Sequence, residues 1–166
     1  MHHNTVDING VLMLERVAGQ LPQLTRFTLY GISSMLVDSD WLQATSLVDI
    51  RSSKLRFISL TKTILAPRLF EVLLSLPRLR NVEFLDCVLT EPELAMNIVK
   101  KHQQSAKKSA TVGISSLTIG TPKVNISWPA ELLLELIACL PHLKSCTIYG
   151  DYVLRNAIKE KHPQFF

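Results

Sequence analysis

Side chains that could carry out chemistry are few in this sequence and lie far apart. Nucleophilic catalysis requires a base beside a serine or cysteine, and a structural zinc ion requires ligands at short paired spacings. Neither pattern occurs, and Glu91 and Glu93 are better explained as acids in the first turn of a helix. We therefore predict that the chain is not an enzyme and needs no metal or cofactor. The histidines are His2, His3, His102, His142 and His162.

The cysteines, Cys87, Cys139 and Cys146, all lie within apolar patterns. An odd number at unrelated spacings does not favour a disulfide framework, so we expect three reduced thiols in the core. The N-terminus lacks a basic stretch followed by an apolar one, and no apolar run reaches the ~18 residues that span a bilayer. These features predict a cytoplasmic or nuclear protein.

Two basic stretches contribute to the net charge of +4. The denser one, KKHQQSAKK at residues 100–108, is either a solvated helix end or a contact for nucleic acid or an acidic partner. It contains no aromatic side chain on which a base could stack, which makes nucleic acid the less favoured partner. Its cations are Lys100, Lys101, Lys107 and Lys108, and the second stretch holds Arg51, Lys54 and Arg56.

A repeated unit must position whatever site exists. LPQLTRFTLYG, LPRLRNVEFLD and LPHLKSCTIYG each open with Leu-Pro and continue as an alternating apolar run. The unit Leu-x-x-apolar-x-apolar occurs five times at intervals of 24 to 35 residues, a period typical of a solenoid. Its first positions are Leu24, Leu55, Leu79, Ile114 and Leu143.

Each unit predicts a strand, and helices are predicted between the strands. Alternation of apolar and polar residues predicts strands at 26–30, 57–61, 81–85, 116–120 and 145–149. Helical periodicity predicts helices near 11–21, 41–48, 69–76, 94–99 and 132–140, with a closing helix at 152–161. Proline lacks an amide donor, so the repeated Leu-Pro ends a helix just before the next strand.

Strands joined by helical crossovers must run parallel. A doubly wound sheet would bury both faces, and its strands would be apolar throughout. Here the middle of every strand is polar, and no glycine-rich phosphate turn follows the first strand. We therefore predict a single α/β domain over 1–166, a short right-handed solenoid with about five parallel strands on its concave face and helices on its convex face. The polar middle residues are Thr28, Ser59, Glu83, Thr118 and Thr147.

Two helix starts and one loop side chain are also predicted. Thr90 and Glu93 have the spacing of a capping box, and Ser127 stands where it could cap the helix that follows Pro129. Trp128, in a long loop, is expected to pack back onto the core.

The repeats resemble leucine-rich repeat proteins. LRNVEFLDC, which runs from Leu79 to Cys87, matches the family core Leu-x-x-Leu-x-Leu-x-x-(Asn or Cys) in full. The other units match its first six positions and depart at the ninth, which is Ile32, Thr63, Pro122 or Asp151. Long, irregular repeats with true helices look like the ribonuclease-inhibitor-like and F-box-associated subclass. That resemblance implies a substrate-recognition role in a ubiquitin ligase and, if a longer chain exists, a ligase adaptor as partner.

The outward side chains of the strands form the candidate binding surface. This surface is largely neutral, with hydroxyls in the middle and aromatic or aliphatic side chains at its sides. Exposed aromatic groups on a rigid concave face are typical of an interaction surface. The alternative explanation is ordinary β-propensity, since Thr and Tyr are common in strands in any case. We predict a non-catalytic module that binds an unidentified protein; the alternative is a basic repeat protein for nucleic acid or an acidic partner. The predicted face comprises Arg26, Thr28, Tyr30, Phe57, Ser59, Asn81, Glu83, Leu85, Thr118, Thr147 and Tyr149.

Overall fold

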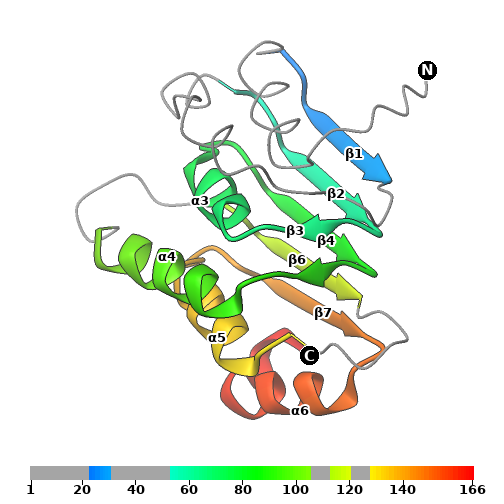
Figure 1. Cartoon of the computed structure of the whole chain (residues 1–166), viewed down its shortest axis with the longest axis vertical. Coiled ribbons are helices and arrows are strands. Elements are labelled where there is room, and N and C mark those ends of the chain that lie inside the picture. The colour runs from blue at the N-terminus through cyan, green and yellow to red at the C-terminus, as the bar shows by residue number, and fades with distance from the viewer. Residues whose placement is uncertain (1–22, 31–52, 106–112, 121–127) are drawn as a thin grey trace.

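The main element of the fold is a parallel sheet with its five strands in simple chain order. In the computed structural model, which describes residues 23–30, 53–105, 113–120 and 128–166, the order is β1-β2-β4-β6-β7 (Figure 1). The strands are β1 (Arg26–Tyr30), β2 (Phe57–Thr61), β4 (Asn81–Leu85), β6 (Ser116–Gly120) and β7 (Ser145–Tyr149). These are the ranges in which the repeat predicts strands, and their simple succession differs from the reversing order of a doubly wound sheet.

Helices cover one side of this sheet. Figure 1 shows α3, α4 and α5 layered on that side, with α6 beyond β7 at the C-terminal end. The helices are α3 (Arg68–Ser75), α4 (Pro92–Ser105), α5 (Ala130–Ala138) and α6 (Tyr152–Lys161), followed by a 3₁₀ turn at Pro163–Phe165. The closing helix thus has the predicted bounds, whereas the helices predicted near 11–21 and 41–48 lie outside the described residues.

The core lies between the sheet and the helices. The strands pair in one register, so the second residues of all five lie side by side, as do the fourth. The two rows are Phe27, Ile58, Val82, Leu117 and Cys146, and Leu29, Leu60, Phe84, Ile119 and Ile148. All but the half-buried Leu29 are buried, which is the outcome that period-two alternation predicts.

Three aromatic rings form the centre of this core. The ring of Phe84 on β4 stacks on Trp128, with 5.5 Å between centroids. Phe70 on α3 meets both edge-on, at 6.5 Å from Phe84 and 6.0 Å from Trp128. The prediction that Trp128 packs back onto the core is therefore confirmed.

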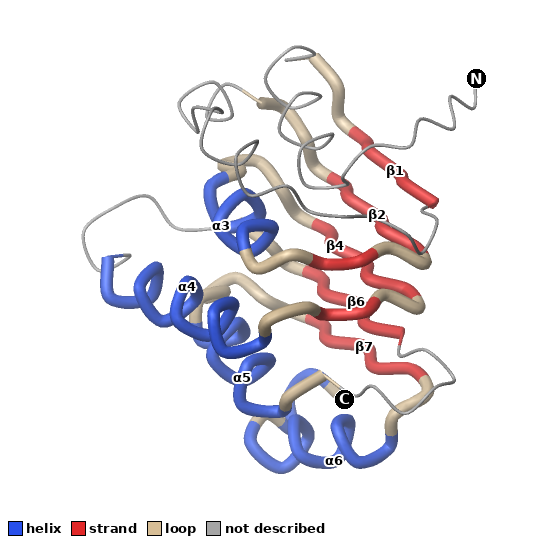
Figure 2. The backbone as a smooth tube through the Cα atoms, viewed as in Figure 1, coloured by secondary structure: helices blue, strands red, loops and turns tan. Residues whose placement is uncertain are grey.

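A second, two-stranded parallel ladder was not predicted. It consists of β3 (Ile64–Leu65) and β5 (Val88–Leu89), which leave the ends of β2 and β4 and lead toward the helices (Figure 2). The amide of Val88 donates to the carbonyl of Thr63 at 3.1 Å, and the amide of Thr90 to that of Leu65 at 3.1 Å. Two-residue strands carry too short an alternation to be recognised in a sequence.

The predicted capping box at Thr90 is wrong. The hydroxyl of Thr90 donates to the Leu65 carbonyl at 3.2 Å, so it joins two repeats instead of capping α4. The carbonyl of Glu91 accepts the amides of Leu94 and Ala95, which makes Glu91 the residue from which α4 begins. The residue preceding α5 is Pro129, which provides no side-chain cap, and Ser127, the other predicted N-cap, lies outside the described residues.

The residue that follows a strand takes a left-handed backbone in three repeats. These residues are Lys62 (φ 51°), Asp86 (φ 53°) and Gly150 (φ 79°). The amide of Lys62 donates to Leu85 and that of Asp86 to Gly120, at 2.9 Å each, so this turn continues the ladder between repeats. A side chain disfavours this conformation, and glycine adopts it freely.

Replacing Gly150 with alanine should therefore lower the free energy of unfolding by about 1–2 kcal/mol. The added Cβ clashes with the backbone in a left-handed conformation. Urea denaturation followed by circular dichroism measures the change. Asp86→Gly is the converse control, because it places glycine at the matching left-handed position and should cause no such loss. Equal losses in the two variants would show that the turn conformation is not the cause.

Candidate protein-binding face

The side of the sheet turned away from α3, α4 and α5, called the open face below, presents three rows of side chains. Because the register is in phase, each row runs across all five strands. The first row is Arg26, Phe57, Asn81, Ser116 and Ser145; the second is Thr28, Ser59, Glu83, Thr118 and Thr147; the third is Tyr30, Thr61, Leu85, Gly120 and Tyr149. The structure thus gathers all the sequence-predicted face residues on one surface.

The middle row differs in one residue from what the sequence predicts. Thr28 is exposed, and Glu83, Thr118 and Thr147 are half-buried, but Ser59 is only 6% exposed. Its short side chain lies between Thr28 and Glu83 on the adjacent strands and between Phe57 and Thr61 on its own strand. The Ser59 side chain therefore points toward the open face, but it leaves little surface for a partner to contact.

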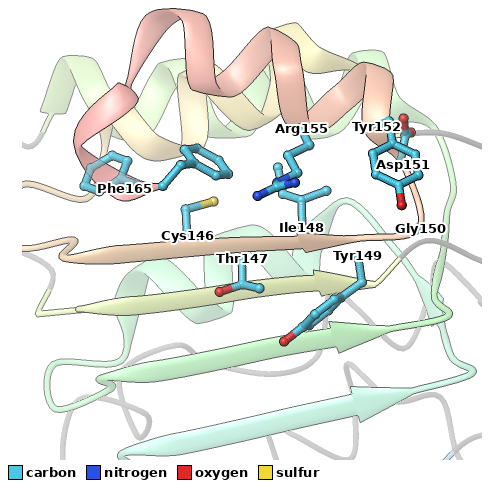
Figure 3. A pocket seen from close by; sticks show the side chains of 10 residues that line it. Cys146, Thr147, Ile148, Tyr149, Gly150, Asp151, Tyr152, Arg155 and Phe165 are labelled. Carbon is cyan, nitrogen blue, oxygen red and sulfur yellow. The ribbon is translucent and has the colours of Figure 1, made fainter.

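The third row ends in two exposed tyrosines. Tyr30 on β1 is 64% exposed and Tyr149 on β7 is 59% exposed, at opposite ends of the sheet. Between them lie half-buried Thr61 and Leu85 and buried Gly120. Figure 3 shows Tyr149 and Thr147 pointing away from the side of β7 on which α6 lies. A rigid sheet thus holds two separate aromatic side chains in solvent.

Two cationic side chains lie against aromatic rings of this face. The guanidinium of Arg26 lies 3.9 Å above the ring of Phe57, which pairs two predicted face residues. The ammonium of Lys62 lies 5.4 Å from the centre of the Tyr30 ring, and a hydrogen bond with Tyr30 raises the pKa of Lys62. Lys62 was not predicted, because it follows its strand and reaches the neighbouring repeat only through sheet pairing.

A hollow of about 390 Å³ lies beside the last strand. Figure 3 shows Cys146 and Ile148 pointing into it from β7, with Arg155 from α6 and Phe165 from the 3₁₀ turn. The carboxylate of Asp151 accepts the Leu154 amide at 2.9 Å, the N-cap of α6. Burial raises the pKa of the Cys146 thiol to about 11, so the sulfur facing this hollow is a neutral thiol at pH 7.

The other two cysteines share that environment. Burial raises the pKa of Cys87 and of Cys139 to about 11 as well. Their thiols donate to backbone carbonyls, Cys87 to Leu60 at 3.2 Å and Cys139 to Val99 at 3.5 Å. All three are buried free thiols that pack in the core.

Alkylation should report this burial. At pH 8 the folded protein should react with iodoacetamide about 10²-fold more slowly than the protein in denaturant, because the thiolate is the reacting form and its pKa is about two units higher in the fold. Equal alkylation rates in buffer and denaturant would contradict the burial of the thiols.

The same pKa shift predicts how stability depends on pH. Because the folded pKa of each thiol lies above its unfolded value, the stability that the neutral thiols contribute is complete below about pH 9 and falls as the pH rises toward 11.

Within the described ranges, no three His, Cys, Asp or Glu side chains lie close enough to share a metal ion. Among the helices that the structure describes, none is long and apolar enough to cross a membrane.

The basic run predicted at residues 100–108 is described only in part. Lys100 and Lys101 are exposed, and partial burial lowers the pKa of His102. Lys107 and Lys108 lie outside the described residues, as does Arg51.

Comparison with known proteins adds a likeness of fold. A solved structure from Caenorhabditis elegans, the tropomodulin C-terminal domain, superposes with a TM-score of 0.51 at 13% identity, over 93% of this chain and 92% of that one. That domain has a leucine-rich-repeat-like fold. No family model matches the chain, and no curated protein matches its sequence.

These findings overturn the assignment to the ribonuclease-inhibitor-like and F-box-associated subclass. The structural likeness is to a tropomodulin domain, and neither a family model nor a curated protein links the chain to an F-box. Irregular repeat length and true helices are therefore too general to identify a subclass. The expected ubiquitin-ligase role rested on that assignment alone, and the comparisons do not support it.

Proposed function

We propose that this chain is a short leucine-rich-repeat-like solenoid that binds another protein on its open face and catalyses no reaction. The observation that carries the proposal is the pair of exposed tyrosines at the two ends of one row. A buried aromatic anchor is the commonest hot spot of protein interfaces, and tyrosine loses little conformational entropy when it is held in place.

The dimensions of the face suit a segment of secondary structure. Adjacent strands are about 4.8 Å apart, so the four spacings from β1 to β7 separate Tyr30 from Tyr149 by roughly 19 Å. An α-helix with its side chains is about 10–12 Å wide. One helix, or two to three extended strands, would fit between the tyrosines and cover the half-buried Thr118 and Leu85.

Support for this role also comes from the charge of the face. In its three rows the charged side chains are Arg26, which lies over Phe57, and the half-buried Glu83. A mostly neutral surface loses little solvation energy when a partner covers it. Because the three thiols are buried and free, we place this activity in the cytoplasm or nucleus, where thiols remain reduced.

The test compares tyrosines on and off the face. Proteins captured by the wild type would be identified, and the affinity of each would be measured with purified components. The Tyr30→Ala/Tyr149→Ala variant should weaken a true partner about 30-fold or more, the effect of losing one or two hot spots. Tyr152→Ala removes a tyrosine of α6 that is even more exposed, at 77%, and should change the affinity less than about twofold.

Circular dichroism and urea denaturation would show that both variants fold. A partner that binds the double variant and the wild type equally would place its contact elsewhere and contradict the proposed face. So would equal losses in the double variant and in Tyr152→Ala, because they would reflect a general effect of removing surface tyrosines.

A further inference from the structure

A row of basic side chains lies along the edge where the strands begin. The residue just before each strand pairs with its counterpart in the next repeat: the Arg56 amide donates to Thr25 at 2.8 Å and the Arg80 amide to Arg56 at 2.9 Å. The row continues through Ser115 to Lys144, again with 2.8 Å bonds. Neighbouring members of the row, such as Arg56 and Arg80 or Arg80 and Ser115, thus stand side by side although they are 24 to 35 positions apart in the sequence.

Three more basic residues widen this row. Each stands two positions ahead of a row member: Lys54, Arg78 and His142. Lys54 bonds to Gln23 at 2.6 Å, and the other two are exposed. The cationic edge, as we name it, comprises Lys54, Arg56, Arg78, Arg80, His142 and Lys144.

Nearby carboxylates do not cancel this charge. All strands run one way and the helices return the other way, so the ends of strands and the starts of helices share the opposite edge. Six acids stand there: Glu71, Asp86, Glu91, Glu93, Glu131 and Asp151. Among described residues, no carboxylate pairs with Arg56, Arg78, Arg80 or Lys144.

The structure also holds one of these arginines in place. Arg80 donates from Nη1 to the Leu79 carbonyl at 3.1 Å, and the Ser115 hydroxyl donates to the Arg80 carbonyl at 3.3 Å. Its guanidinium lies where a Cβ on Gly113 would be, so the absence of a side chain there gives it room. A hollow of about 380 Å³ opens beside it, and its lining includes Lys144.

We propose that the cationic edge binds an acidic segment of polypeptide. From β2 to β7 the row crosses three strand spacings, roughly 14 Å, which matches about four residues of an extended chain. Arginine donates two parallel hydrogen bonds to a carboxylate, so Arg56 and Arg80 supply geometry as well as charge. Single-stranded nucleic acid also needs aromatic platforms, and the cationic edge contains none.

This binding is separate from that of the open face, because Tyr30 and Tyr149 belong to the row at the other end of the strands. It also differs from the basic helix end identified in the sequence, since Lys100 and Lys101 lie on α4, in the helical layer. The cationic edge cannot be recognised in any single repeat, because its side chains come together only when the repeats stack.

A fluorescein-labelled hexaglutamate peptide is the probe, and fluorescence anisotropy at several salt concentrations is the measurement. Arg56→Gln/Arg80→Gln should weaken binding about tenfold or more, since close charged pairs govern such contacts. Lys100→Gln/Lys101→Gln removes the same net charge from the helical layer and should change the affinity less than about twofold. Equal losses in the two variants would overturn the proposal in favour of general attraction by net charge.

Gly113→Ala provides a test without any change of charge. The added methyl group displaces the end of a flexible side chain, so the fold should tolerate it while the Arg80 guanidinium moves. We expect weaker binding of the peptide in this variant and an unchanged circular dichroism spectrum. Unchanged affinity, measured alongside the arginine double variant, would show that Arg80 is not held for this purpose.

Nucleic acid is the outcome that would replace this proposal. A labelled single-stranded oligonucleotide and a duplex of equal charge are titrated under the same conditions. If either binds more tightly than hexaglutamate at physiological salt, and the arginine double variant abolishes that binding, the edge is a phosphate-binding surface. Absence of peptide binding by the wild type at low salt would also reject an acidic polypeptide as the ligand.

Discussion

Replacing Phe84 with alanine is expected to lower the free energy of unfolding by about 3–5 kcal/mol. Phe84 is 1% exposed, and its ring contacts Phe70 edge-on and Trp128 face-on. Removing it leaves a cavity that a rigid strand on one side and α3 on the other cannot close. Both the lost burial and the lost ring contacts contribute to the effect.

Urea denaturation followed by circular dichroism would measure this loss. Phe84→Leu is the matched control: it keeps most of the volume and should cost less than about 1.5–2 kcal/mol. The fluorescence of Trp128 should also change in the alanine variant, because its stacking partner is gone. A loss below about 1 kcal/mol for Phe84→Ala would mean that the three rings do not form the centre of the core.

The second large effect concerns the leucine that begins each repeat unit. Leu79→Ala should cost about 2–5 kcal/mol, and Leu143→Ala should lie at the lower end of that range. Leu79 is completely buried in the middle of the sheet, whereas Leu143 is 8% exposed and precedes the last strand. Neighbouring repeats on both sides of Leu79 hold their positions, so its cavity collapses less.

Thermal and urea unfolding of the two variants would be compared under identical conditions. Because β4, the strand that follows Leu79, pairs with β2 and β6, the loss at Leu79 should weaken the packing of the repeats on both sides. A larger loss at Leu143 than at Leu79 would contradict the stacked arrangement. It would indicate that the C-terminal repeat carries the stability.

The proposed face and the cationic edge follow from the same geometry. When repeats of similar structure stack in register, the residues at each position of the repeat form a row across the sheet. The outward positions of the strands form the open face, and the position before the strand forms the row of Arg56, Arg80 and Lys144.

Much of the architecture could be predicted from the sequence because it depends on local physics. Alternation with period two places one face of a strand in the core, and Leu-Pro ends the preceding helix. These rules located all five strands, and helical periodicity located the closing helix. They also put the face residues from Arg26 to Tyr149 on one side of the sheet, since all five units share one phase.

The subclass and the cap of α4 could not be predicted in this way. The spacing of a capping box predicts that the Thr90 hydroxyl accepts an amide of its own helix, whereas in the structure it donates to Leu65 of the neighbouring repeat. Irregular repeat lengths are compatible with several kinds of leucine-rich-repeat-like fold, so they could not support an F-box association.

What the sequence by itself determined, then, is the period, the strands and the direction in which each side chain points. Tertiary structure alone decided what lies beside each side chain, because strands distant in the chain become neighbours only through the sheet. That is why Ser59 is buried between residues of other strands, and why Lys62 reaches Tyr30. It is also why Arg56, Arg80 and Lys144, each ordinary in its own repeat, form a single charged edge.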